Sequence, residues 1–239
     1  MRRDVRRVIV FTACVVLGLS GCVKKSPPEA SSETAKKYLK LRGYEFDRTG
    51  FFAAVNAGDT ALVDAFIKAE IDPNVQDPTT GRTALISAAA HGDLAVVKAL
   101  VERKANINIK DRNGYTALFH AIEARYDDVS SFLVQQPSLD LNARGKNGVT
   151  ALISYVWRGD SKVVSNLLSR GADVNLPDAD GDSALHGAAQ NGNVDIALQL
   201  LAKGANVNSK NKLGGTPLMW AAVYGDEQLS QVLIEDHVY

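Results

Sequence analysis

The chain has 239 residues, with 27 basic and 27 acidic side chains, so its formal net charge is zero. This length allows one sizeable domain or one continuous stack of repeats, and it argues against a large two-domain enzyme. Removal of residues 1–21 would take away four arginines and one aspartate, leaving 23 basic and 26 acidic side chains. That balance gives no electrostatic reason to expect a nucleic acid as partner.

Residues 1–21 have the parts of a secretory signal peptide. Four arginines lie within the first seven residues, an uncharged run extends from Val8 to Leu19, and small residues precede Cys22. This run is shorter than the roughly 20 apolar residues that a membrane-spanning helix needs, which disfavours a permanent transmembrane anchor. The sequence therefore predicts an exported protein that loses residues 1–21.

Cys22 is expected to carry a lipid. The segment Leu19-Ser20-Gly21-Cys22 resembles the bacterial lipobox, which implies acylation of the cysteine sulfur and cleavage just before it. The alternative is an ordinary signal peptide with an incidental cysteine. Acylation would anchor the protein to the bilayer facing the periplasm, and the absence of aspartate at Val23 slightly favours the outer membrane. Residues 22–32, rich in proline and serine, are expected to form a flexible linker.

The rest of the sequence repeats with a period near 33 residues. A Thr/Ser-Ala/Pro-Leu triplet recurs, and a glycine stands two residues before each copy. Small residues, a turn, a second apolar segment and an Asn or Asp pair follow each triplet. This order predicts two helices per copy, the first capped by the hydroxyl residue. The triplets begin at Thr83, Thr116, Thr150, Ser183 and Thr216.

These copies resemble the ankyrin repeat, with its Ala-Ala pair and its Gly-Ala-Asp-Val-Asn close; one such close is Gly204-Ala205-Asn206-Val207-Asn208. The resemblance implies an all-α solenoid of about six helix-turn-helix repeats with hairpin tips, covering residues 47–239. Residues 33–46 are expected to form an N-terminal capping helix. The resemblance specifies the fold and says almost nothing about an activity. The repeats fall at about 47–80, a degenerate copy, and at 81–113, 114–147, 148–180, 181–213 and 214–239.

The copy at 114–147 departs from the pattern in two ways. Arg125 replaces the glycine between the two helices, so this turn cannot rely on the conformational freedom of glycine. One extra residue lies between Gln135 and Asn147.

No catalytic, metal or cofactor site is expected. The four histidines fall in different parts of the sequence without metal or triad spacing, and His186 is expected to bridge backbone groups of adjoining repeats. The aspartates of residues 178–182 could suggest a calcium loop. However, Ser183 and Ala189 stand where an EF-hand needs glycine and glutamate, which favours a hairpin tip. We therefore do not expect an enzyme.

In stacks of this family, a partner usually meets the hairpin tips and the exposed face of the first helices. Tryptophan, tyrosine and arginine are enriched among residues that dominate binding energy. Trp220, one helical turn before Tyr224, could add to the predicted binding residues. The alternative for each aromatic residue is packing against its neighbouring repeat. The predicted partner-binding residues are Arg112, Tyr115, Trp157, Arg158, Gln190, Asn191 and Tyr224.

Together these features predict a monomeric, membrane-tethered module that binds another protein, either an envelope protein or an incoming effector. Among bacterial proteins that look like this, one role is immunity, in which the tethered stack neutralises an antibacterial effector. The alternative is a scaffold or accessory factor for a periplasmic enzyme or stress-defence system.

Overall fold

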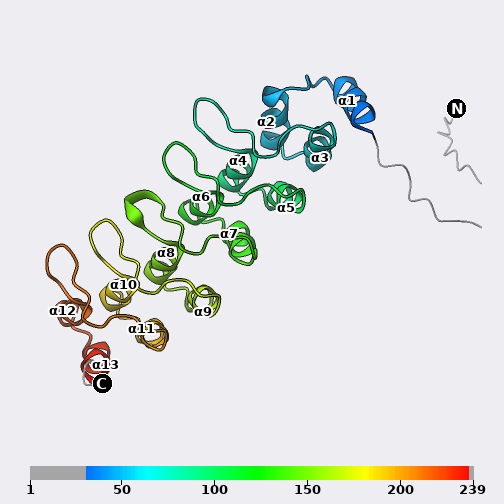
Figure 1. Ribbon diagram of the computed structural model, residues 1–239. Coiled ribbons are helices and arrows are strands. Elements are labelled where there is room, and N and C mark those ends of the chain that lie inside the picture. The colour runs from blue at the N-terminus through cyan, green and yellow to red at the C-terminus, as the bar shows by residue number, and fades with distance from the viewer. Residues whose placement is uncertain (1–30, 237–239) are drawn as a thin grey trace, which may run out of the picture.

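The computed structural model describes residues 31–236, which form an elongated stack of helix pairs (Figure 1). First helices make one row and second helices another, and hairpin loops project from the row of first helices (Figure 1). The predicted all-α solenoid is confirmed. The predicted signal peptide, Cys22 and most of the linker lie outside the described residues. The helix pairs are α2 Arg48–Asn56 and α3 Thr60–Lys68, α4 Ala84–His91 and α5 Leu94–Glu102, α6 Ala117–Glu123 and α7 Asp127–Val134, α8 Ala151–Arg158 and α9 Ser161–Ser169, α10 Ala184–Gln190 and α11 Val194–Leu201, and α12 Pro217–Val223 and α13 Glu227–Asp236.

The helix that precedes the pairs, α1, spans Ser32–Leu41 and packs on α3. Its N-terminus is capped by Ser31, whose hydroxyl accepts a hydrogen bond from the backbone N–H of Thr34. After the helix, Gly43 adopts a φ of +81°, the left-handed conformation typical of a helix end. The helix thus begins inside the expected linker, and residues 42–46 of the expected capping segment are not helical.

Hydroxyl residues cap four of the first helices, as predicted, whereas Thr116 at the start of α6 makes no side-chain capping hydrogen bond. Thr83, Thr150 and Thr216 each accept a hydrogen bond from the backbone N–H three residues later. Ser183 forms a capping box with His186, whose Nδ1 accepts the backbone N–H of Ser183 at 3.1 Å. The Nε2 of the same imidazole lies 3.1 Å from the carbonyl oxygen of Gly215 in the next repeat. The expectation that His186 bridges adjoining repeats is confirmed.

The core is continuous along the stack, and the second repeat shows how it is built from small residues on the first helix and branched residues on the second. In α4, Ala88 and Ala89 are buried and allow close contact with the neighbouring first helices. In α5, Val96, Val97 and Leu100 are fully buried at helical spacing. No repeat could bury this surface alone, so stability depends on the neighbours.

The polar pair at the end of each repeat forms a ladder along the stack, which we call the asparagine ladder. The side-chain oxygen of Asn74 accepts the backbone N–H of Asn106 at 2.7 Å, one repeat further on. Asn108, Asn142 and Asn175 accept the corresponding N–H groups of Asp140, Asp173 and Asn206 at 2.9, 2.9 and 2.8 Å. Each rung therefore joins the loop of one repeat to the loop of the next.

The third pair, α6 and α7, is joined through Arg125, which has a φ of +59°. This is the left-handed conformation that glycine adopts between the helices of the other pairs, so the turn keeps its shape without glycine. The extra residue of this copy lies in the loop that leads to a short 3-10 turn, η1, at Lys146–Gly148. Next to this loop, α6 and α8 pack less closely than α4 and α6 do.

Aromatic side chains hold the N-terminal end of the stack together. Phe66 of α3 is fully buried, and its ring lies 5.7 Å from Phe51, 6.1 Å from Tyr44 and 6.2 Å from Phe46, centroid to centroid. This cluster joins α2, α3 and the segment after α1. The degenerate first copy is thus stabilised by rings where the later copies use aliphatic residues.

Candidate protein-binding face

The predicted partner-binding residues occupy the hairpin tips and the C-terminal ends of the first helices. Trp157 and Tyr224 are 43% and 53% exposed, whereas Tyr115 is only 9% exposed. Arg112 and Tyr115 lie in the tip before α6, Trp157 and Arg158 end α8, Gln190 ends α10 and is followed by Asn191, and Tyr224 follows α12.

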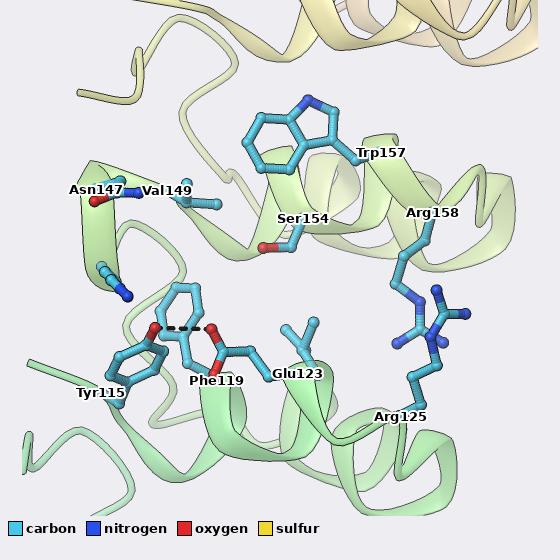
Figure 2. Close-up of a pocket in the computed structure, with 11 residues that line it drawn as sticks. Tyr115, Phe119, Glu123, Arg125, Asn147, Val149, Ser154, Trp157 and Arg158 are labelled. Atoms are coloured by element: carbon cyan, nitrogen blue, oxygen red, sulfur yellow. Dashed lines mark hydrogen bonds between the residues drawn. The ribbon is translucent and has the colours of Figure 1, made fainter. Parts of the chain in front are cut away.

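Tyr115 is not the exposed anchor that its tip position suggested. Its hydroxyl donates a hydrogen bond to Glu123 Oε1 at 2.7 Å (Figure 2). Its ring packs against Phe119 and His120, with centroid distances of 6.4 and 5.3 Å. Burial, reinforced by the hydrogen bond and negative charge of Glu123, raises the pKa of Tyr115 to about 12. The phenol therefore stays protonated at neutral pH and remains a hydrogen-bond donor to the Glu123 carboxylate.

Three of the predicted residues, Tyr115, Trp157 and Arg158, line one pocket of about 640 Å³ between the third and fourth repeats (Figure 2). A pocket of this size lies within the range of known ligand sites. Its walls come from α6, α8 and the η1 tip. The other lining residues are Phe119, Ile122, Glu123, Arg125, Lys146, Asn147, Val149 and Ser154.

The pocket carries more positive than negative charge. Arg125, Lys146 and Arg158 are its cations, and Glu123 is its one acidic lining residue. Arg158 makes an ion pair through Nη2 with Asp127, and its guanidinium lies 5.6 Å from the centroid of the Tyr155 ring. Its Nη1 is buried and has no hydrogen-bond partner in the part of the protein that the structure describes.

Trp157 is positioned by the fifth repeat. A β-carbon added at Gly187 would come within 2.7 Å of the Trp157 ring, so glycine at this position of α10 makes room for the indole. The Nδ2 of Asn191 donates to the Trp157 carbonyl oxygen at 3.0 Å. The Asn191 side chain thus joins the fourth and fifth repeats. The indole of Trp157 remains half exposed in the pocket.

The C-terminal part of the face is a second, more open group. The Nε2 of Gln190 donates to the Tyr224 hydroxyl at 3.3 Å, and the Tyr224 ring stacks on Trp220 at a centroid distance of 6.0 Å. Met219 and Val223 of α12 are exposed beside these residues. Gln190, Tyr224 and Trp220 therefore form one joined surface on the last two repeats.

Arg112 links two hairpin tips. Its Nη2 donates to the carbonyl oxygen of Pro78 in the preceding tip. The guanidinium is exposed but already satisfies a backbone group of its neighbour. Arg112 does not line the pocket that contains Tyr115.

Sequence comparison decides the family. A family model of ankyrin repeats, in three copies, matches residues 50–145 and 152–238. The chain belongs to the ankyrin-repeat family. A search of curated protein sequences finds no match.

Solved ankyrin-repeat structures resemble this protein along most of its length. The ankyrin repeat domain of Bcl-3, a member of the IkappaB protein family, is 26% identical over 84% of this chain and 92% of that chain, with a TM-score of 0.69. An ankyrin repeat domain from Acinetobacter baumannii is 28% identical over 80% and 99%, with a TM-score of 0.71. A polypeptide from the complex of a predatory endopeptidase of Bdellovibrio bacteriovorus with an immunity protein is 30% identical over 77% and 96%, with a TM-score of 0.63.

Ankyrin repeats are typically protein-interaction scaffolds without enzymatic activity. Residues 31–236 contain no group of three His, Cys, Asp or Glu side chains placed to bind a metal ion. The aspartates of residues 178–182 form a hairpin tip: Asp178 Oδ1 accepts the backbone N–H groups of Asp180 and Asp182, both at 2.9 Å. This geometry agrees with the hairpin interpretation of that segment.

Asp111 is expected to make the stability of this ankyrin stack depend on pH. Burial disfavours its charged form, but hydrogen bonds from His120 and from the backbone N–H groups of Tyr115 and Asn113 outweigh burial and lower the pKa of Asp111. A lowered folded-state pKa means that the stabilisation is complete above the unfolded value, near 3.9, and is lost as the pH falls through the folded value.

We therefore expect Asp111→Asn to lower the free energy of unfolding by about 2 kcal/mol at pH 7, and by progressively less below about pH 4. Urea unfolding of both proteins between pH 7 and pH 2 measures this difference. Asp180→Asn, at an exposed tip position, is the control and should behave like the parent. A parent-minus-variant difference that does not change with pH would contradict the assignment to the Asp111 carboxylate.

The sequence-based choice of binding residues missed Arg125, which lines the same pocket as Trp157, whereas Lys146, also in this pocket, lies at a hairpin tip where a partner was expected. The replacement of glycine by Arg125 was visible as a departure from the repeat, but only the structure shows that its side chain reaches the pocket. Lys146 occupies an ordinary tip position, and its sequence context gives no separate signal.

Proposed function

We propose that this protein is a membrane-tethered protein-binding module of a bacterial envelope, held by acylated Cys22 and facing the periplasm. Residues 1–22 support export and acylation. Among residues 31–236, no helix has the length and apolar character needed to cross a bilayer, so a tether would have to come from elsewhere in the protein. The solenoid begins at Ser32, shortly after Cys22, which would hold the repeats near the membrane surface.

We further propose that this protein acts as an immunity protein. The partner that it binds and neutralises is an antibacterial effector. The observation that carries the binding role is the row of half-exposed aromatic and polar side chains from Trp157 to Tyr224 on the first-helix side of the stack. Support for immunity comes from the 30% identical polypeptide in the endopeptidase–immunity protein complex. The alternative role, a scaffold or accessory factor, would use the same surface, but its partner would be a periplasmic enzyme or a stress-defence protein.

The tether is tested by Cys22→Ser in a bacterial host, with the full-length protein as parent. Acyl groups hold a protein stably at a bilayer when two are present, so we expect the parent in the membrane fraction and the variant in the soluble fraction. Cys14→Ser is the matched control, because Cys14 lies in the segment that processing removes. Retention of the Cys22→Ser protein in membranes would overturn the proposed tether. Density separation of the two membranes tests the slight preference for the outer one.

The two roles are separated by deleting the gene and growing the deletion strain with its parent. Immunity predicts that the deletion strain is killed by sister cells and that the full-length protein, but not a variant with an altered binding face, rescues it. A deletion strain that tolerates its sisters but has defects in envelope assembly or stress survival would reject immunity in favour of the scaffold.

A further inference from the structure

The turn between α6 and α7 has an arginine, Arg125, at a backbone position that favours glycine. At the equivalent turn the other five pairs have glycine, with φ between +63° and +75°, and Arg125 takes the same conformation. The left-handed region is unfavourable for a residue with a β-carbon, so arginine occupies this turn against the local backbone preference. Such an outlier suggests a function for the side chain. The five glycines are Gly58, Gly92, Gly159, Gly192 and Gly225.

The Arg125 side chain lines the pocket between the third and fourth repeats, together with Arg158 of α8. Both guanidinium groups lie on the side away from Tyr115 and Asn147 (Figure 2). Within residues 31–236, the Arg125 side chain has no ion pair or hydrogen bond, and Arg158 Nη1 is buried without a partner. Arg125 is exposed, and Arg158 already pairs with Asp127 through Nη2, so Arg158 Nη1 is the buried donor of this corner that lacks an acceptor.

The rest of the pocket shows what kind of acceptor fits. Glu123 accepts the Tyr115 hydroxyl, and within residues 31–236 no hydrogen bond or ion pair joins it to Arg125 or Arg158. Trp157 presents a half-exposed indole, and Phe119 and Val149 add apolar surface. Guanidinium groups match planar carboxylates, with two parallel hydrogen bonds. The pocket thus combines a carboxylate-binding corner with an apolar wall.

We propose that this pocket binds a carboxylate that the partner protein presents beside an apolar side chain. The carboxylate lies against Arg125 and Arg158, and the apolar group lies against Trp157. The inference rests on the proposed protein-binding function and specifies the chemistry that the face recognises. The carboxylate is that of an Asp or Glu side chain of the partner.

The test is a titration of the full-length protein, purified from membranes in detergent, with three short peptides, monitored by the NMR signal of the Trp157 indole N–H. The peptides are N-acetyl-Leu-Asp-Leu amide, its Asn counterpart, and N-acetyl-Leu-Leu with a free carboxylate. We expect saturable shifts with the Asp peptide, and at least tenfold weaker binding of the Asn peptide. Tighter binding of the free-carboxylate peptide than of the Asp peptide would overturn the assignment to a side-chain carboxylate.

Arg125→Gly separates binding from structure. Because glycine relieves the left-handed backbone, this variant should have an equal or higher melting temperature and yet bind the Asp peptide at least fivefold more weakly. Lys104→Gly is the matched control: Lys104 is also a cation in the left-handed conformation, with a φ of +63°, but it lies at the end of α5, away from the pocket. This control should keep the parent affinity.

Three further results would overturn the proposal: equal binding of the Asp and Asn peptides, no saturable shift up to about 10 mM peptide, or unchanged affinity in Arg125→Gly. Its failure can be told apart from failure of the proposed function. If Arg125→Gly retains the protein partner while altered Trp157 and Tyr224 lose it, the binding face stands and only the carboxylate site is wrong. If none of these changes weakens partner binding, the binding face itself is rejected.

Discussion

Replacing both Trp157 and Tyr224 with alanine should weaken binding of the protein partner by more than tenfold, or at least about 1.4 kcal/mol. The two aromatic side chains are 43% and 53% exposed and lie on different repeats of the same face. Large aromatic side chains carry much of the binding energy at protein interfaces. Since about half of each ring is already in water, its removal should change the melting temperature little.

The comparison needs a partner captured by crosslinking from membranes, and equilibrium binding of the purified pair measures the loss. Leu198→Ala is the matched control, because Leu198 is also an apolar residue, 49% exposed, but it belongs to α11 in the row of second helices. It should leave affinity unchanged. Equal affinity of the parent and the double variant would show that the partner binds elsewhere, as would a large effect of Leu198→Ala.

Phe66→Ala should lower stability more than any surface change, by about 4 kcal/mol. The Phe66 ring is fully buried and touches three other aromatic rings, so its removal leaves a cavity that a terminal repeat has few neighbours to fill. Because repeats contact only adjacent repeats, the loss should fall on α1 to α3 and leave the later pairs folded. Hydrogen exchange resolves this difference along the stack.

Leu41→Ala is the control for Phe66→Ala. Leu41 is an apolar residue of α1 and is 77% exposed, so its truncation should change stability by less than about 0.5 kcal/mol. Uniform loss of protection from α1 to α13 in Phe66→Ala would mean that the stack unfolds as one cooperative unit, which contradicts the local expectation.

Much of the fold follows from local chemistry that is visible in the sequence. Hydroxyl residues before each first helix predict caps, and Thr83 and Thr150 act as such. The apolar spacing of the second helices predicts the buried face that α5 shows. His186 could be assigned a bridging role because its position recurs in a known repeat, and its two nitrogens do meet two repeats.

The site was less predictable because it depends on contacts between repeats. A tip position suggested that Tyr115 is exposed, but Glu123 accepts its hydroxyl and the ring turns inward. Trp157 depends on space left by Gly187, which lies one repeat away. The asparagine ladder likewise uses acceptors about 31 or 32 residues from their donors, so no local pattern reveals the hydrogen bonds.

The asparagine ladder bears on how the stack can bend. Every rung joins adjacent turns only, so a small change in pitch can spread over all the repeats at little strain in any one of them. Trp157 and Tyr224 lie two repeats apart, so bending of the stack would change the distance between them. A partner that binds both residues at once would restrict this bending and make the stack more rigid.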